Sequence, residues 1–316
     1  MNRVDDIEVS VVVASHRPDL INGLVDCFPG EADGGVAWEL IVVADYPVET
    51  FREKYHRARW IFVDDTSISR KRNRGVREAA GPVVAFIDDD CRPLAGWLPE
   101  GLARLKQNPG WAGVEGQTLI AGEDRGNGRY REFKRLESRG YRTNNIFYRT
   151  DTFREAGGFD ERFTVQREDI DLAFTIMARG GEIGFCTTAR VEHLFREGEK
   201  WDLLKNCINR RFDPLLYKKH RAAYRRRFRS PVPGTVSTVL CLHTAIVVAL
   251  IAGHFVAHTI AVDTAVTVVL AARATGIRNA LSPALVRECA SRAISPAVLF
   301  GALIYGSIRY RCLLLW

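Results

Sequence analysis

The chain has 316 residues, 47% of them hydrophobic, which suffices for one large α/β domain with a full core and an additional segment. Its seven cysteines are scattered and never spaced as CxxC, which argues against a zinc ribbon or a disulfide scaffold and predicts reduced thiols. The formal net charge of +7 is concentrated in one segment rather than spread evenly. Charged residues lead directly into the first apolar run, so we expect no cleavable signal peptide.

Strand-like and helical segments alternate in the first part of the chain. Strands are predicted over Ile7–Ala14, Glu39–Ala44, Trp60–Val63 and Val83–Ile87, and a helix over Ser69–Ala80. This alternation is typical of a doubly wound, mostly parallel sheet. Polar residues follow the strands, namely Ser15, Asp45, Asp64 and Asp88. Because the carboxyl ends of parallel strands meet at one edge, we expect a nucleotide to bind there.

Three carboxylates, Asp88, Asp89 and Asp90, directly follow the fourth predicted strand. On an extended chain the side chains of Asp88 and Asp90 leave the same face and can jointly hold a hard divalent ion. A solvated acidic loop is the alternative interpretation.

The chain lacks the glycine-rich phosphate loops of two large enzyme classes. No GxGxxG follows the first strand and no GxxxxGK[ST] occurs, which disfavours a dinucleotide dehydrogenase and a P-loop nucleotidase. A bound diphosphate would then need a metal ion and basic side chains. The acids can hold the metal, and Arg70, Lys71 and Arg72 lie on the helix just upstream.

A second polar cluster follows further along the chain. Gly157-Gly158-Phe159-Asp160 form a glycine turn with an aromatic and an acid, and Arg167-Glu168-Asp169 open a helix that ends at Gly180-Gly181. The free amides and the dipole at a helix N-terminus favour Asp169 as an anion, which suits a proton acceptor. The alternative is that Glu168 and Asp169 only cap the helix.

The C-terminal part combines a basic cluster with long apolar segments. Lysines and arginines crowd residues 218–229, and from Ser230 to Ala272 the only formally charged side chain is Asp263. A bilayer-spanning helix needs about 17–25 apolar residues, so two spans are predicted, at about 235–253 and 255–272. A basic cluster next to a span is the positive-inside signature, which predicts a cytoplasmic N-terminal domain. The basic cluster alone also fits a nucleic-acid patch or a solvated helix face.

Three features of this region stay open at the sequence level. Ala293–Ile308 is uncharged but short and contains Pro296, so it fits a third span, a re-entrant piece or an interfacial helix. His243 and Asp263 are unfavourable in lipid, and each should face a helix neighbour or the headgroup level. A buried, soluble helical pair is the alternative for the whole region.

The order of these motifs resembles the family 2 inverting glycosyltransferases of the GT-A fold. The resemblance covers about residues 7–200 and is carried by Ser-His-Arg-Pro, Arg-Lys-Arg-Asn-Arg-Gly, Phe-Ile-Asp-Asp-Asp, Gly-Gly-Phe-Asp-Glu and Arg-Glu-Asp-Ile-Asp-Leu. It implies a Rossmann-like catalytic domain at residues 1–215, followed by a membrane-associated helical region at 216–316. It also implies a UDP-, GDP- or dTDP-linked sugar donor with Mg²⁺ or Mn²⁺ bridging its diphosphate.

The resemblance assigns a role to each matching position. The nucleotide side would comprise Ser15, Arg17, Asp45, Arg72, Asn73, Asp88 and Asp89. Asp90 and His193 would hold the metal, although a lone histidine is also often structural. Asp169 would be the catalytic base. The acceptor side would comprise Gly157, Gly158, Phe159, Asp160 and Glu168.

The chain also departs from the family pattern in two places. The paired acids and Gly-Ser that often follow the second strand are replaced by Ala44-Asp45-Tyr46-Pro47, and the Gln-x-x-Arg-Trp element of processive synthases is missing. We therefore expect transfer of one sugar, to a lipid-linked or polyprenyl-linked acceptor at the cytoplasmic membrane face, with no nucleic-acid partner. A sugar-phosphate nucleotidyltransferase and a non-catalytic, membrane-anchored nucleotide-sugar binder remain the alternatives.

Overall fold

A computed structural model describes residues 7–28, 32–122, 130, 133–195, 201–228, 230, 232–275 and 282–314. The chain divides into two compact units, one of residues 1–122 and 133–195 and the other of residues 123–132 and 196–316. The main division therefore falls after residue 195, before the predicted boundary at residue 215.

The first unit alternates strands and helices, as the sequence pattern predicts. Its strands are β1 (Val9–Ser15), β2 (Ala32–Asp33), β3 (Val36–Ala44), β4 (Ala58–Phe62), β5 (Val83–Ile87), β6 (Cys91–Pro93), β7 (Trp111–Ile120), β8 (Asn145–Arg149) and β9 (Glu182–His193). Its helices are α1 (Ile21–Val25), α2 (Glu49–Lys54), α3 (Ile68–Glu78), α4 (Trp97–Gln107), η2 (Lys134–Glu137), α6 (Thr150–Glu155) and α7 (Glu168–Ala178).

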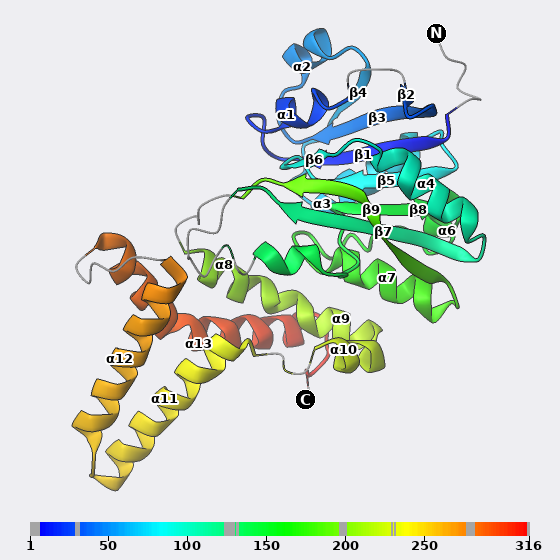
Figure 1. Ribbon diagram of the computed structural model, residues 1–316. Helices are drawn as coiled ribbons and strands as arrows, with labels where there is room; N and C mark the ends of the chain where they lie inside the picture. Colours follow the sequence, from blue (N-terminus) through cyan, green and yellow to red (C-terminus); the bar gives the residue numbers. More distant parts are fainter. Residues whose placement is uncertain are drawn as a thin grey trace. The chain divides into compact units, whose positions relative to one another are not determined.

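The nine strands form one mixed sheet (Figure 1). The order is β2-β3-β1-β5-β8-β7-β9-β6, with β4 also pairing with β3. Strands β4, β3, β1 and β5 are parallel, so their carboxyl ends meet at one edge, as predicted. Strand β8 runs antiparallel to both β5 and β7, a reversal that the alternation of strands and helices does not predict.

Side chains of alternating strand positions fill a core on each face of the sheet. On β1, Val11 and Val13 pack with α1 and α4, whereas Val12 faces the other way and packs with α3, α6 and α7. Gly75 allows α3 to approach β1 closely, because a Cβ atom there would overlap Val12. This close packing brings the first turns of α3 to the carboxyl edge of the parallel strands.

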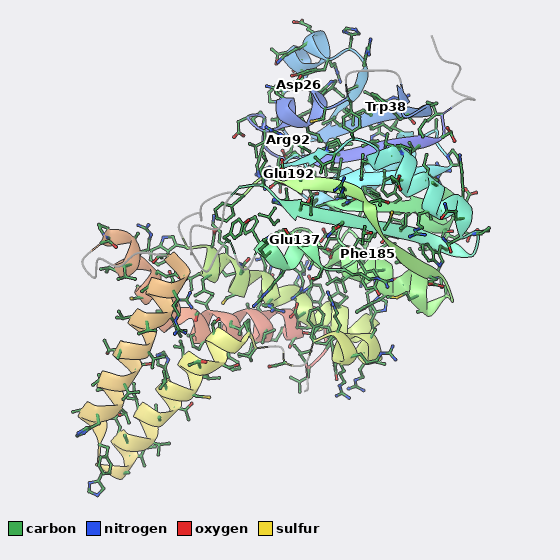
Figure 2. The ribbon with its side chains drawn as sticks, viewed as in Figure 1. Asp26, Trp38, Arg92, Glu137, Phe185 and Glu192 are labelled. Atoms are coloured by element: carbon green, nitrogen blue, oxygen red, sulfur yellow. The ribbon has the colours of Figure 1, made fainter. Side chains whose placement is uncertain are left out.

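The far edge of the sheet is completed by β6, which pairs antiparallel with β9. Arg92 and Glu192 are register partners on these two strands and lie close together in Figure 2. This pairing requires the chain to turn back directly after the three acids. Within the turn, the Cys91 N–H donates to the Asp88 carbonyl at 3.0 Å. The expectation that Asp88 and Asp90 lie on an extended chain is therefore wrong.

The second unit is helical. Its elements are α8 (Asp202–Asn209), η3 (Arg210–Phe212), α9 (Asp213–Lys219), α10 (Arg221–Arg227), α11 (Gly234–Ala252), α12 (Val256–Thr275) and α13 (Pro283–Arg309). Within the described residues, α11, α12 and α13 are long and apolar enough to cross a membrane, by length and composition. The first two lie where the sequence predicts spans and form the hairpin seen in yellow and orange in Figure 1.

The open segment Ala293–Ile308 lies inside α13, which contains Pro296. In the most apolar stretch of 18 residues of α13, 44% of the residues are buried. The corresponding shares are 17% for α11 and 11% for α12. Part of this burial comes from η3 and α9, since a Cβ atom on Gly306 would meet the Arg211 carbonyl and Pro214. Helix α13 is therefore covered by protein to a greater extent than α11 and α12.

Two polar side chains of the hairpin face one another. His243 Nε2 on α11 lies 3.8 Å from an Asp263 carboxylate oxygen on α12. This agrees with the expectation that each residue faces a helix neighbour.

Candidate active site

The Asp89 carboxylate holds the turn that follows β1. One of its oxygens accepts hydrogen bonds from the backbone N–H groups of His16 (2.9 Å) and Arg17 (3.1 Å) and from the Ser15 hydroxyl (3.1 Å). The other oxygen accepts from the Arg17 guanidinium at 3.1 Å. Burial raises the pKa of Asp89, while the His16 N–H group and the Arg17 charge act in the opposite direction. Asp89 thus fixes the position of the Ser15–Arg17 turn.

Asp45, which follows β3, is joined to the same turn through Lys71 of α3. The Lys71 Nζ donates to the Ser15 carbonyl at 2.8 Å and to the Asp45 carboxylate at 3.1 Å, and Lys71 is only 2% exposed. Burial would raise the pKa of Asp45, but hydrogen bonds with His16 and Lys71 bring it below its ordinary value. Asp45 is therefore an anion next to the exposed His16 side chain.

Arg72 connects the two acid clusters that the sequence places far apart. Its guanidinium donates to Asp88 at 2.8 Å and to Glu168 at 2.7 Å. Burial alone would lower the pKa of Arg72, but the charges of the two carboxylates raise it. The acids after β5 and the start of α7 thus converge on one buried cation.

Asp90 points toward β9 rather than toward Asp88. One of its oxygens accepts from Arg17 at 2.7 Å, and the other lies 3.5 Å from His193 Nε2. The other ring nitrogen of His193, Nδ1, lies 3.0 Å from the Leu194 carbonyl, a contact that orients the ring.

A candidate metal centre lies at this position. Asp90, Cys91 and His193 offer one oxygen, one sulfur and one nitrogen atom that all lie within 4.8 Å of one another. Carboxylate and imidazole are ordinary ligands of divalent ions, so the donor set fits such an ion. Cys91 was not among the predicted ligands, and Asp88 is outside this group.

Helix α7 begins with two adjacent carboxyls in different surroundings. Burial and the neighbouring Asp169 charge raise the pKa of Glu168 to about 7, although Arg72 opposes this shift. Burial also raises the pKa of Asp169, against the Ile170 N–H group and the charges of Arg72, Arg167 and Arg142. The Ile170 N–H group donates to Asp169 at 2.7 Å, as expected for an acid at a helix N-terminus.

Arg167, which precedes this pair, has a left-handed backbone with φ of 79°. A non-glycine residue in this region carries strain of about 1–3 kcal/mol, which the surrounding structure must offset. The conformation turns the chain sharply at the point where the two carboxyls enter the site.

Asn73 lies on the side of α3 that faces the glycine turn. Its amide Nδ2 donates to the Phe159 carbonyl at 2.8 Å and to Glu161 at 3.1 Å, and its Oδ1 accepts from the Phe159 N–H at 2.9 Å. The resemblance predicts Asn73 on the nucleotide side. In the structure both ends of its side chain hold the predicted acceptor loop.

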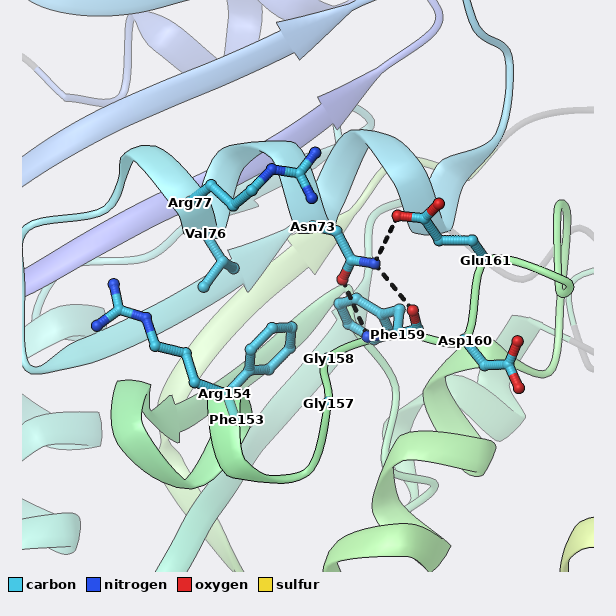
Figure 3. A pocket seen from close by; sticks show the side chains of 10 residues that line it. All are labelled: Asn73, Val76, Arg77, Phe153, Arg154, Gly157, Gly158, Phe159, Asp160 and Glu161. Carbon is cyan, nitrogen blue, oxygen red and sulfur yellow. Dashed lines mark hydrogen bonds between the residues drawn. The ribbon is translucent and has the colours of Figure 1, made fainter.

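A pocket of about 490 Å³ opens beside this loop (Figure 3). It is lined by Asn73, Val76 and Arg77 of α3, Phe153 and Arg154 of α6, and residues 157–161. Its size is in the usual range of small-molecule sites. The predicted acceptor residues Gly157, Gly158, Phe159 and Asp160 all belong to its wall.

The structure thus joins most of the predicted residues through α3. Lys71 and Arg72 reach the residues that follow β1, β3 and β5, and Arg72 and Asn73 reach α7 and the glycine turn. The sequence predicts that Lys71, with Arg70 and Arg72, helps to neutralise a diphosphate. In the structure Lys71 is buried and bonded to the Ser15 carbonyl and to Asp45.

Comparison with known proteins supports this interpretation of the fold and the motifs. Residues 32–160 match the description "Glycosyl transferase family 2". These residues form a glycosyl transferase family 2 domain. Helix α3 and the three acids that follow β5 lie within the matched residues, whereas α7 and His193 lie beyond them.

Two curated relatives of the family 2 domain are glycosyltransferases by name. N-acetylgalactosaminyltransferase 7 of Drosophila melanogaster is 29% identical in an alignment of 162 residues that covers 40% of this chain and 27% of the relative. Glucosyl-dolichyl phosphate glucuronosyltransferase of Haloferax volcanii is 27% identical in an alignment of 167 residues that covers 45% of this chain and 52% of the relative. The chain thus spans about a quarter and about half of the lengths of these relatives.

The fold also matches a solved structure. The crystal structure of GalNAc-T7 with UDP, GalNAc and Mn²⁺ aligns with a TM-score of 0.50 at 14% sequence identity, covering 67% of this chain and 50% of that one. This likeness confirms the predicted GT-A fold class.

Proposed function

We propose that this chain is an inverting, metal-dependent glycosyltransferase that moves one sugar from a nucleotide diphosphate sugar to a hydroxyl of a lipid-linked or membrane-proximal acceptor. The observation that carries the proposal is the bridge from Asp88 through Arg72 to Glu168. It joins the edge where a nucleotide would bind to the helix that begins with a candidate base. The family 2 domain and the names of its relatives support the same activity.

On the donor side, the Ser15–Arg17 turn, Asp45 and Asp88 are assigned to the nucleotide. The anionic Asp45 and the exposed His16 suit hydrogen bonds to a base or a ribose. The structural neighbour holds UDP, which makes UDP the first donor nucleotide to test. A divalent ion held by Asp90 and His193 would offset the charge of the departing diphosphate.

On the acceptor side, Asp169 is assigned as the base that removes the proton of the attacking hydroxyl. Proton acceptance requires the carboxylate form. Burial raises the pKa of Asp169 and disfavours that form, and the positive charges of Arg72, Arg167 and Arg142 partly offset the effect. Direct attack by the activated hydroxyl inverts the anomeric carbon. Proton NMR of the product checks this, since a retained configuration would rule out direct displacement.

A membrane-linked acceptor is supported by the C-terminal helices and by one relative. Three described helices are long and apolar enough to span a bilayer, and the name of the Haloferax relative includes a dolichyl phosphate. Six exposed cations, Lys218, Lys219, Arg221, Arg225, Arg226 and Arg227, precede α11 and suit the anionic cytoplasmic leaflet.

The donor site is tested by thermal unfolding of the full chain in detergent. UDP at about 100 times its Kd should stabilise the fold by about 2.7 kcal/mol, which corresponds to roughly 5–10 °C in Tm. Mn²⁺ should be required for most of this shift, and EDTA should abolish it. Asp90→Ala should lose the Mn²⁺-dependent part.

The matched control is Glu53→Ala, which removes an exposed acid on α2 outside the site. It should respond to UDP and Mn²⁺ like the unaltered chain. An Asp90→Ala variant that keeps the full Mn²⁺-dependent shift would contradict the assignment of the metal centre.

A further inference from the structure

We infer that the pocket between α3 and α6 binds an oxyanion, a phosphate or a carboxylate, through Arg77 and Arg154, and that this group belongs to the acceptor saccharide. The second part rests on the proposed function. The site is separate from the Asp88–Asp90 cluster, which does not line the pocket.

The acids of the pocket are already neutralised by other residues. Both Asp160 oxygens accept from the Arg162 guanidinium, at 2.6–3.1 Å. Glu161 accepts from Asn73 at 3.1 Å and lies 3.4 Å from Arg70. Neither carboxylate is therefore available to balance the arginines that face it.

The arginines of the pocket are much less engaged. Among the described residues Arg77 has no hydrogen bond or ion pair, and Arg154 has only a long contact of 4.0 Å with Asp151 and a 3.4 Å bond to the Ala79 carbonyl. In Figure 3 the Arg77 side chain extends along α3 at the top of the pocket, Arg154 lies at the left, and Asp160 and Glu161 lie at the right. The two arginines therefore carry positive charge that Asp160 and Glu161 do not balance.

A helix C-terminus is the other common reason for a basic residue at Arg77, because the dipole there is negative. At this end of α3, however, the Glu78 carbonyl already accepts from Arg59 at 3.1 Å and the Ala79 carbonyl from Arg154. These carbonyls have their cations without Arg77. Guanidinium groups bind carboxylate and phosphate in a forked geometry, which makes an oxyanion the matching ligand.

The rest of the pocket suits a saccharide that carries such a group. Val76, Phe153 and Phe159 give it an apolar base, and Gly157 leaves open space where a side chain would stand. Asn73 lines the pocket and also fixes Phe159 in the acceptor loop. A ligand here would touch the loop that leads to α7, which links the pocket to the acceptor side of the reaction.

Binding is tested with inorganic phosphate by isothermal titration, with UDP and Mn²⁺ at saturation so that the donor site is filled. The unaltered chain should bind phosphate, and Arg77→Gln should weaken binding roughly tenfold, because a charge-assisted contact is lost. Arg74→Gln is the matched control, since Arg74 lies one turn earlier on α3, pairs with Glu78 and does not line the pocket. Absence of phosphate binding, or equal binding by Arg77→Gln, would overturn the site.

A kinetic measurement assigns the source of the oxyanion. If the group belongs to the acceptor, phosphate should raise the KM for the acceptor without changing the KM for the donor, and Arg77→Gln should remove this effect. A phosphate effect on kcat alone would overturn the acceptor assignment. The titration does not depend on transfer, so failure of the proposed function would be seen separately.

Discussion

At the scale of single residues, Asp169 illustrates how opposing influences set a reactive group. Burial raises the pKa of its carboxyl, whereas three arginines and the Ile170 N–H group lower it. Its neighbour Glu168 is more deeply buried and has a pKa raised to about 7. A carboxylate can accept a proton only after losing its own, so the rate of transfer should rise as pH increases through the raised pKa values of this pair.

The variant Asp169→Asn should lower kcat by about 10²–10⁴, because the amide cannot take the acceptor proton. Binding of UDP should be unchanged, because Asp169 is not assigned to the nucleotide. The increase in rate with pH should also disappear from the residual activity. These effects are measured as kcat over a pH series, with UDP affinity determined by calorimetry.

The matched control for this variant is Glu182→Gln, at the exposed start of β9. It should keep both the rate and the pH profile. Near-normal turnover by Asp169→Asn would mean that another group is the base.

At the scale of elements, the regular parts of the fold were accessible to sequence reasoning. Strand β5 has the predicted bounds Val83–Ile87, and β1 and β4 each begin two residues from their predicted starts. A buried, β-branched run next to a polar residue is a local signal, and the parallel order follows from alternation with helices. The candidate site residues at the carboxyl ends of these strands could therefore be named without coordinates.

The parts that were not foreseen depend on distant partners. The turn at Asp88–Cys91 exists because β6 pairs with β9, about a hundred residues later in the chain. The bond from Arg72 to Glu168 and those from Asn73 to Phe159 also join residues far apart in sequence. No local pattern encodes such pairs, so the directions of Asp88, Asp90 and Asn73 required the tertiary structure.

The role of α3 in positioning the acceptor loop leads to a prediction for Asn73. The change Asn73→Ala removes three hydrogen bonds that hold residues 159–161. A small displacement of a positioning loop can reduce catalysis strongly, so kcat/KM for the acceptor should fall about 10–100-fold while the Kd for UDP stays the same. Steady-state kinetics with each substrate varied in turn separates the two effects.

The matched control is Asn108→Ala, which also removes an asparagine side chain that is hydrogen-bonded to the backbone. Asn108 donates to the Arg104 carbonyl at the end of α4, on the opposite face of the sheet. Its kinetics should match those of the unaltered chain. If Asn73→Ala raised the Kd for UDP instead, the original nucleotide-side assignment of Asn73 would be preferred.

At the scale of the whole molecule, the C-terminal unit is organised as a membrane hairpin would be. Helices α11 and α12 have 19 and 20 residues, and only residues 253–255 connect them. Six exposed cations precede α11, and each contributes about 1 kcal/mol of attraction to an anionic leaflet. Both ends of the hairpin should therefore lie on the cytoplasmic side, with its tip on the other side.

This arrangement predicts a labelling pattern in intact cells that produce the full chain. A cysteine at the hairpin tip, His254→Cys, should react with a membrane-impermeant maleimide added outside. Glu53→Cys, on the exposed surface of α2, should react only after the cells are opened. Labelling is compared with that of the unaltered chain, because seven native cysteines are present.

Equal protection of both positions would indicate that the hairpin does not cross the membrane, and labelling of Glu53→Cys from outside would reverse the orientation. The topology matters for the reaction because a cytoplasmic catalytic unit would meet nucleotide sugars where cells make them, at the surface from which a lipid-linked acceptor presents its hydroxyl.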